Sequence, residues 1–134
     1  MVAIATLYEE EDDGTRSNQD ISSLTGQSES LYRGAKADLD AESGRPSIYS
    51  VQARLIFCQY LLCTSCPSEA WYALGTAIQL IMALGMHRRQ SLLGIESDNV
   101  VRECRKRVFW TACVLDMYLS AMLGRPHLLS LIHI

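Results

Sequence analysis

Several features that would place this chain in a broad functional class are missing from its sequence. No apolar run reaches the roughly 18 residues needed to cross a membrane, so we expect no membrane partner. Residues 1–8 carry no basic flank, which argues against a secretory signal peptide. The net charge of −3 and the pI of about 5.5 argue against a chain that binds nucleic acid through most of its surface.

The motifs of common catalytic and metal sites are missing as well. The sequence contains no P-loop, no G-x-G-x-x-G and no G-x-S-x-G, and its acidic residues gather in two polar stretches at 9–13 and 38–42. Cys63 and Cys66 form a C-x-x-C pair, but no second pair is present to complete the four ligands of a structural zinc. The five cysteines mostly fall within apolar patterns, which is typical of reduced thiols in an intracellular protein. We therefore expect no enzyme, and neither a cofactor nor a metal in these residues.

Helical apolar periodicity is the main signal that the sequence does carry. One stripe predicts a helix from about residue 47 to 62, and another predicts a helix from about 68 to 84 that ends at Gly85. Between them, Pro67 fits a first helical position and Ser65 is a candidate N-cap. No convincing strand pattern occurs, and the connections are short. The predicted fold class is all-α, with neighbouring helices packed antiparallel.

The stretch Arg102–Pro126 predicts the helix around which the others pack. It begins with Arg102, Arg105, Lys106 and Arg107, continues almost wholly apolar to Leu123, and stops at Gly124, Arg125 and Pro126. A helix that is apolar on all sides must be buried on all sides. We therefore predict a central buried helix at about 99–123, with Asp98 or Asn99 as its cap. Its expected apolar stripe is Val100, Cys104, Val108, Thr111, Leu115, Tyr118 and Met122.

Residues 1–46 form a more polar N-terminal segment whose start we expect to be missing. Residues 9–23 have the composition of a solvated loop, and Ser28 or Ser30 is a candidate cap for a short helix that continues to about Leu39. The organisation expected from the sequence is thus residues 1–46, then a helical domain at 47–128, then a short tail at 129–134.

Asp116 is the single charge within the apolar part of the predicted central helix. A buried carboxylate is costly unless it is paired, so we expect a partner in Arg125, in Arg88 or in a backbone N–H of a loop. A polar contact from Asp116 to a bound ligand is the functional alternative. The basic residues that open the helix spread around its circumference, which favours a solvated first turn over a DNA-contacting face.

Taken together, these motifs resemble the fungal-specific transcription factor domain. This is the regulatory middle region of zinc binuclear-cluster transcription factors, also called the xylanolytic activator regulatory domain. The pattern matches L-G-M-H-R at residues 84–88, then E-x-R-K-R-x-F-W, L-D and L-G-R-P within 103–126, and covers about residues 49–128. One departure is Met117, where the family often has arginine. The signature residues are Gly85, His87, Arg88, Arg105, Arg107, Trp110, Asp116, Gly124, Arg125 and Pro126.

The resemblance implies a regulatory part of a nuclear transcription factor that controls RNA polymerase II. DNA and zinc would then be bound by a six-cysteine module that these residues lack. Co-regulator proteins or a small-molecule effector are the partners it implies for this part. The alternative from a different class is a cytosolic helical scaffold that binds only proteins.

A further hypothesis concerns the last six residues, 129–134. Their sequence LSLIHI is the translation of a transposase adapter used in sequencing libraries. We hypothesise that this tail derives from the adapter and that the natural chain continues differently after Leu128. Genomic DNA that encodes these residues next to His127 would contradict the hypothesis.

Overall fold

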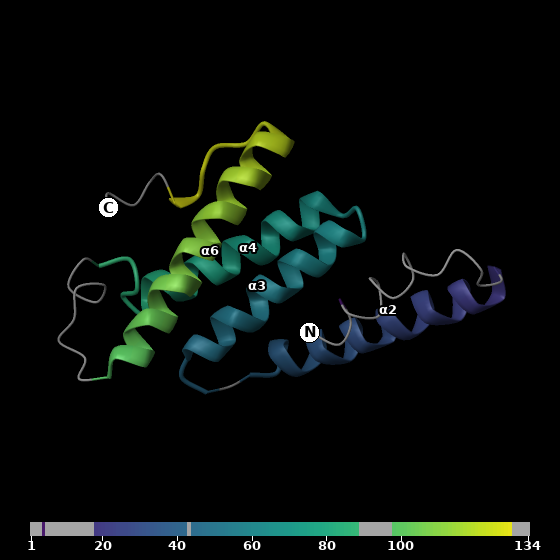
Figure 1. Cartoon of the computed structure of the whole chain (residues 1–134), viewed down its shortest axis with the longest axis horizontal. Coiled ribbons are helices and arrows are strands. Elements are labelled where there is room, and N and C mark those ends of the chain that lie inside the picture. Colours follow the sequence, from purple (N-terminus) through teal and green to yellow (C-terminus); the bar gives the residue numbers. More distant parts are fainter. Residues whose placement is uncertain (1–3, 5–17, 43, 89–97, 130–134) are drawn as a thin grey trace. The chain divides into compact units, whose positions relative to one another are not determined.

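All regular structure in the described part of the chain is helical (Figure 1). The computed structural model describes residues 4, 18–42, 44–88 and 98–129. Its helices are α2 (Asn18–Asp40), α3 (Ile48–Cys63), α4 (Pro67–Ala83) and α6 (Asn99–Leu123). The prediction of an all-α fold is confirmed. Within the same residues, no helix combines the length and the hydropathy that a membrane span requires.

The chain divides into two compact units, Met1–Gly44 and Arg45–Ile134. The first unit contains α2, a helix of 23 residues that is mostly exposed. α2 starts at Asn18, so the prediction of a loop is wrong for residues 18–23, while residues 9–17 lie outside the described part of the chain. The prediction of a cap at Ser28 or Ser30 is also wrong. Both serines lie inside the helix, where serine costs only about 0.5 kcal/mol relative to alanine. The ion pair between Arg33 and Glu29, one helical turn apart, favours the same conformation.

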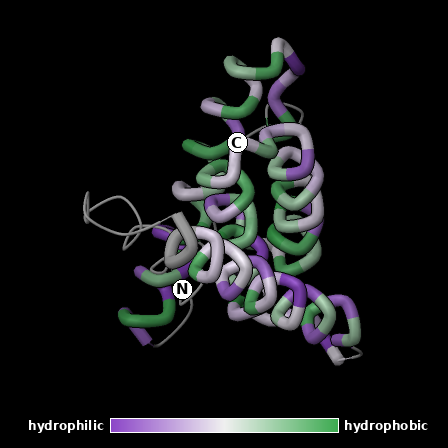
Figure 2. The backbone as a smooth tube through the Cα atoms, turned by 90° about the vertical axis from the view of Figure 1, so that its right-hand side faces the viewer, coloured by the Kyte–Doolittle hydropathy of each residue, from purple (hydrophilic) through white to green (hydrophobic). Residues whose placement is uncertain are grey.

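The second unit begins with α3, whose start is fixed by a capping box. The hydroxyl of Ser47 accepts from the backbone N–H of Ser50, and the Ser50 hydroxyl accepts from the N–H of Ser47. The predicted helix start at residue 47 is confirmed. Figure 2 shows the hydrophobic colour recurring along the helices. α3 and α4 pack closely against each other. Their core residues are Val51, Leu55, Cys58, Leu61, Ala70, Leu74, Ala77, Ile78 and Ile81.

The turn between α3 and α4 differs from the prediction at one residue. Pro67 does occupy the start of α4, but Ser65 is not its N-cap. Ser65 instead adopts a left-handed conformation with φ of 59°, and the N–H of Cys66 donates to the carbonyl of Leu61 at 2.8 Å. Ser65 therefore ends α3 in the way that glycine usually ends a helix.

The bounds of α6 agree with the predicted helix at about 99–123. The Asp98 carboxylate accepts from the N–H of Val100 at 2.9 Å, and Gly124 ends the helix with φ of 62°. The expectation that all faces are buried is wrong, and so is most of the predicted stripe. Of its residues only Val108 is buried; Cys104 and Leu115 are partly buried, and Val100, Thr111, Tyr118 and Met122 are exposed. The buried residues are Val108, Phe109, Ala112, Asp116, Leu119 and Ser120, whereas Trp110, Val114, Met117, Tyr118 and Met122 are about half exposed.

The helix with neighbours on two sides is α4 rather than α6. α4 packs extensively against both α3 and α6, whereas α3 and α6 contact each other little. Only the side of α6 that faces α4 and the adjoining part of α3 can be covered in this arrangement. The remaining apolar side chains of α6 are left at the surface of the described residues.

Candidate functional site

The chain after α6 turns back, and Asp116 holds the returning segment. We call residues 124–129 the return segment. The two carboxylate oxygens of Asp116 accept from the backbone N–H groups of Leu128 at 2.9 Å and Leu129 at 3.0 Å. The carboxylate is almost completely buried, and Nδ1 of the half-exposed His127 lies 3.9 Å from it. Of the partners expected for Asp116, the loop backbone is the one found.

Arg125 contacts an aromatic ring rather than Asp116. Its guanidinium carbon lies 4.8 Å from the ring centroid of Trp71 near the start of α4, which is cation–π geometry. The predicted pairing of Asp116 with Arg125 is therefore wrong. Both residues nevertheless act on the same segment, because Arg125 ties its beginning to α4 while Asp116 binds its end. One arginine nitrogen, Nη1, and the indole Nε1 of Trp71 are buried without a hydrogen-bond partner in the described residues.

The two signature glycines end helices. Gly85 has φ of 65°, and the N–H of Met86 donates to the carbonyl of Ile81 at 3.0 Å. Gly124 has φ of 62°, and the N–H of Arg125 donates to the carbonyl of Ser120 at 3.1 Å. These 6→1 hydrogen bonds with glycine in the left-handed region define Schellman-type caps. The caps let Met86 and the return segment fold back onto the helices they follow.

The basic signature residues pair locally or lie near helix ends. Arg107 contacts Glu103 one turn earlier at 3.3 Å, and Arg102 donates to Asn99 at 2.7 Å. Arg88 is exposed beside Gly85, and Arg105 is partly buried. His87 follows Gly85, and its Nδ1 is buried without a hydrogen-bond partner in the described residues. Trp110 is 58% exposed, and Pro126 is exposed on the return segment.

The signature residues do not converge on one catalytic or ligand-binding centre. Gly85, His87 and Arg88 follow the C-terminal end of α4, whereas Arg125 stacks on Trp71 near its N-terminal end. The 14 residues from Trp71 to Gly85 separate these groups by about 21 Å along the helix axis. Among the described residues, no group of three histidine, cysteine or acidic side chains is placed to hold a metal ion. Most of the signature residues therefore lie at helix ends or in the return segment, whereas Arg105, Arg107 and Trp110 lie within α6.

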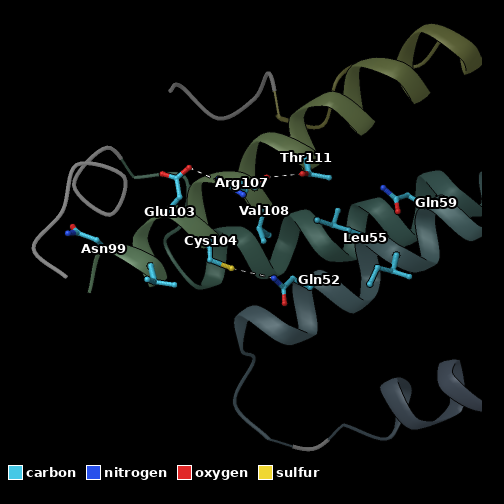
Figure 3. A pocket seen from close by; sticks show the side chains of 11 residues that line it. Gln52, Leu55, Gln59, Asn99, Glu103, Cys104, Arg107, Val108 and Thr111 are labelled. Atoms are coloured by element: carbon cyan, nitrogen blue, oxygen red, sulfur yellow. Dashed lines mark hydrogen bonds and ion pairs between the residues drawn. The ribbon is translucent and has the colours of Figure 1, made fainter. Parts of the chain in front are cut away.

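A groove lies between α3 and α6 in the second unit. It consists of two hollows of about 800 Å³ and 780 Å³ that share Gln59, Glu103, Arg107 and Thr111. Figure 3 shows side chains of both helices extending into the first hollow, where Nε2 of Gln52 lies 3.5 Å from Sγ of Cys104. Sequence reasoning missed this site. The sequence feature that could have indicated it is one helical face with the spacing i, i+3, i+4, i+7, formed by Gln52, Leu55, Ile56 and Gln59.

The groove combines an apolar floor with polar edges. Leu55 and Val108 are buried at its base, whereas Val100 is 75% exposed at one end. Lys106 and Arg107 outnumber Glu103 among the charged lining residues, so the edge formed by α6 is weakly basic. Such a surface can bind an apolar partner with acidic flanks, and it presents no nucleophile paired with a base.

The described residues form a helical domain in which Asp116, Gly124 and Arg125 hold the return segment. A groove lies between α3 and α6. Comparison with known proteins identifies the class further. A family model described as the fungal specific transcription factor domain matches residues 1–134, and the chain belongs to this family. The resemblance stated from the sequence is thereby confirmed.

Several individual relatives are named as transcription regulators or gene activators. A transcriptional regulatory protein of Saccharomyces cerevisiae is 29% identical over 126 residues, which are 94% of this chain and 16% of the relative. Activator of stress genes 1 from the same yeast is 33% identical over 72% of this chain and 10% of its own length. An ABC-transporter-regulating transcription factor of Aspergillus oryzae is 38% identical over 59% of this chain and 9% of its own length. No solved structure matches the chain.

Proposed function

We propose that these residues form a regulatory part of a longer fungal transcription factor that acts in the nucleus. The single observation that carries this proposal is the use of the family signature inside the fold. Asp116, Gly124 and Arg125 hold the return segment, and Arg107 is paired with Glu103 on its own helix. These residues serve contacts within the domain, which favours a regulatory domain over a DNA-binding one.

DNA binding would belong to another part of the whole protein. The chain spans 9% to 16% of the length of the three relatives compared above. We propose that a zinc-cluster module in the remaining length binds DNA, and that zinc is bound there. The residues described here would transmit a signal from a co-regulator protein or a small-molecule effector to RNA polymerase II transcription.

The test compares residues 1–134 with the complete polypeptide in a DNA-binding assay over genomic promoter fragments. We expect residues 1–134 to leave the DNA mobility unchanged at micromolar concentration. The complete polypeptide should retard promoter fragments, and a zinc chelator should abolish the retardation. Zinc-dependent retardation by residues 1–134 alone, or none by the complete polypeptide, would contradict the proposal.

A cytosolic interaction scaffold remains the second candidate, because the exposed apolar residues of α6 favour a protein partner. Transcript profiling and localisation in the source organism separate the two functions. Deletion of the gene should change transcript levels of a defined set of genes, and the tagged protein should accumulate in the nucleus. A cytosolic protein whose deletion leaves all transcripts unchanged would favour the scaffold.

A further inference from the structure

The groove between α3 and α6 has the residue pattern of a helix-binding surface on both of its walls. On α3 the lining residues recur at i, i+3, i+4 and i+7: Gln52, Leu55, Ile56 and Gln59. On α6 the same spacing connects Val100, Glu103, Cys104, Arg107, Val108, Thr111, Val114 and Leu115. Such a stripe is the face with which one helix packs against another. Here the two stripes border an open space, because α3 and α6 touch each other little.

The length of the groove fits a helix better than a small molecule. Its two hollows share four lining residues and extend along α6 from Asn99 to Leu115, a distance of about 24 Å at the rise of an α-helix. Four turns of a helix have this length, and α3 and α6 line the space on two sides. A further helix in the groove would complete a four-helix arrangement of the kind found in helical bundles.

The charges along the groove indicate the chemistry of its occupant. Lys106 and Arg107 stand on the α6 edge, Glu103 offsets one of these charges, and the α3 edge carries the neutral Gln52 and Gln59. An occupant with an apolar face and acidic residues beside it would complement this surface. A second copy of α6 would not, because its first turns carry further arginine and lysine.

We propose that an acidic amphipathic helix from elsewhere in the same polypeptide, outside residues 1–134, occupies this groove. Relatives hold most of their length outside the matched region, since 84% to 91% of the three compared above lies beyond it. A tethered segment also binds at high effective concentration, so a single groove suffices to hold it. The inference does not depend on whether the protein regulates transcription.

Cys104 provides a probe inside the groove, and Cys63 provides a matched reference. Cys104 lines the first hollow and is partly exposed, whereas Cys63 is exposed at the C-terminal end of α3. The experiment measures maleimide labelling of each cysteine, by peptide mass spectrometry, in residues 1–134 and in the longer natural polypeptide that contains residues 1–128. We expect Cys104 to react at least about tenfold more slowly in the longer polypeptide relative to Cys63. Equal relative rates, or a natural polypeptide that ends at residue 134, would overturn the proposal.

Two substitutions on α6 show whether the protection comes from the groove. Thr111→Glu places a negative charge on the groove wall opposite the acidic flank of the occupant, whereas Met117→Glu changes an exposed residue that lines neither hollow. In the longer polypeptide, Thr111→Glu should restore the labelling rate of Cys104, and Met117→Glu should not. In residues 1–134, both variants should keep the melting temperature within a few degrees. Equal effects of the two variants on Cys104 labelling would contradict occupation of the groove.

The source and conformation of the occupant need a separate readout. A reagent that joins a maleimide to a diazirine is attached to Cys104 in the longer polypeptide, and the cross-linked peptides are sequenced after illumination. The expected product is an intramolecular cross-link to an acidic segment with apolar residues at helical spacing. A cross-link between two copies, a cross-link to a non-helical segment, or no cross-link would each overturn the proposal.

Discussion

Asp116 is the one charged side chain that is fully buried in the described part of the chain, and its hydrogen bonds explain why it is buried. The carboxylate binds the two successive amide groups of Leu128 and Leu129, which no helix or sheet would otherwise satisfy. The two N–H donors satisfy both carboxylate oxygens and offset part of the cost of burying the group. The same residue therefore looks anomalous in the sequence and necessary in the fold.

Replacing Asp116 tests this role. We expect Asp116→Ala to lower the free energy of unfolding by about 3 kcal/mol, because two buried N–H groups lose their acceptors. Asp116→Asn keeps one acceptor oxygen and should cost about half as much. Denaturant unfolding of residues 1–134 measures both changes. His127→Ala is the control and should cost less than about 0.5 kcal/mol, because the imidazole is half exposed; equal losses in His127→Ala and Asp116→Ala would contradict the assignment.

The stacking of Arg125 on Trp71 predicts a coupling between these two residues. We expect a double-mutant cycle of Arg125→Met and Trp71→Leu to give a coupling free energy of about 1 kcal/mol. Arg125→Lys should not restore the full stability, because an ammonium group lacks the planar surface that stacks on an indole. Thermal unfolding of the four proteins of the cycle measures the coupling. Additive effects of the two substitutions would rule out the stacking as a stabilising contact.

Burial raises the pKa of the Cys58 thiol to about 12, which predicts a loss of stability at high pH. The neutral thiol is the form that the fold favours. The stabilisation is complete below the pKa of about 8.5 in the unfolded chain, and it is lost as the pH rises towards the folded value. In this window Cys58 should contribute a slope of about −1.4 kcal/mol per pH unit to the free energy of unfolding.

Cys58→Ala isolates that contribution, because the other groups that titrate at high pH are shared by both proteins. The difference in unfolding free energy between the wild type and Cys58→Ala should shrink between pH 9 and pH 11. A difference that stays constant over this range would show that Cys58 is not protected from ionisation by the fold.

At the scale of single helices, three ends in the second unit use the same left-handed cap with different residues. Gly85 and Gly124 fill the left-handed position after α4 and α6, whereas Ser65 fills it after α3. For a residue with a Cβ atom, this conformation costs roughly 1–2 kcal/mol. Serine is tolerated there because the following N–H group of Cys66 completes the same hydrogen bond.

This comparison predicts two substitutions with opposite effects on the free energy of unfolding. Ser65→Gly should raise the free energy of unfolding by about 1 kcal/mol, because glycine removes the strain at positive φ. Gly124→Ala should lower it by a similar amount, although nothing lies within 4 Å of the added Cβ. Chemical denaturation of both variants checks the signs. A stabilising Gly124→Ala would mean that open space, and not backbone conformation, decides the effect.

α6 shows how far helical patterning predicts an element. Its start at Asp98 and its stop at Gly124 follow from local chemistry, since a cap needs only an acceptor for free N–H groups or a residue suited to positive φ. Its buried face could not be predicted in the same way. Where nearly every side chain is apolar, periodicity no longer distinguishes one face from another, and the position of α4 decides it.

At the scale of the whole molecule, the two compact units predict independent folding of the second one. We expect residues 45–134 to remain helical and to unfold cooperatively, because their hydrophobic core lies within α3, α4 and α6. Residues 1–44 alone should lose much of their helicity, since an exposed helix of this length is marginal in water. Circular dichroism with thermal melts measures both. A noncooperative melt of residues 45–134 would contradict the division.

The sequence by itself determined the features that depend on neighbouring residues along the chain. These are the all-α class, the start of α3 at Ser47, the bounds of α6, the glycine caps and the family signature, because each follows from spacing or from the chemistry of a few adjacent residues. The tertiary structure alone decided which groups meet across the chain. It gave Asp116 two backbone amides instead of Arg125, placed Arg125 on Trp71, and left an open groove between α3 and α6. Such contacts depend on how the helices cross, and no local pattern of residues encodes that geometry.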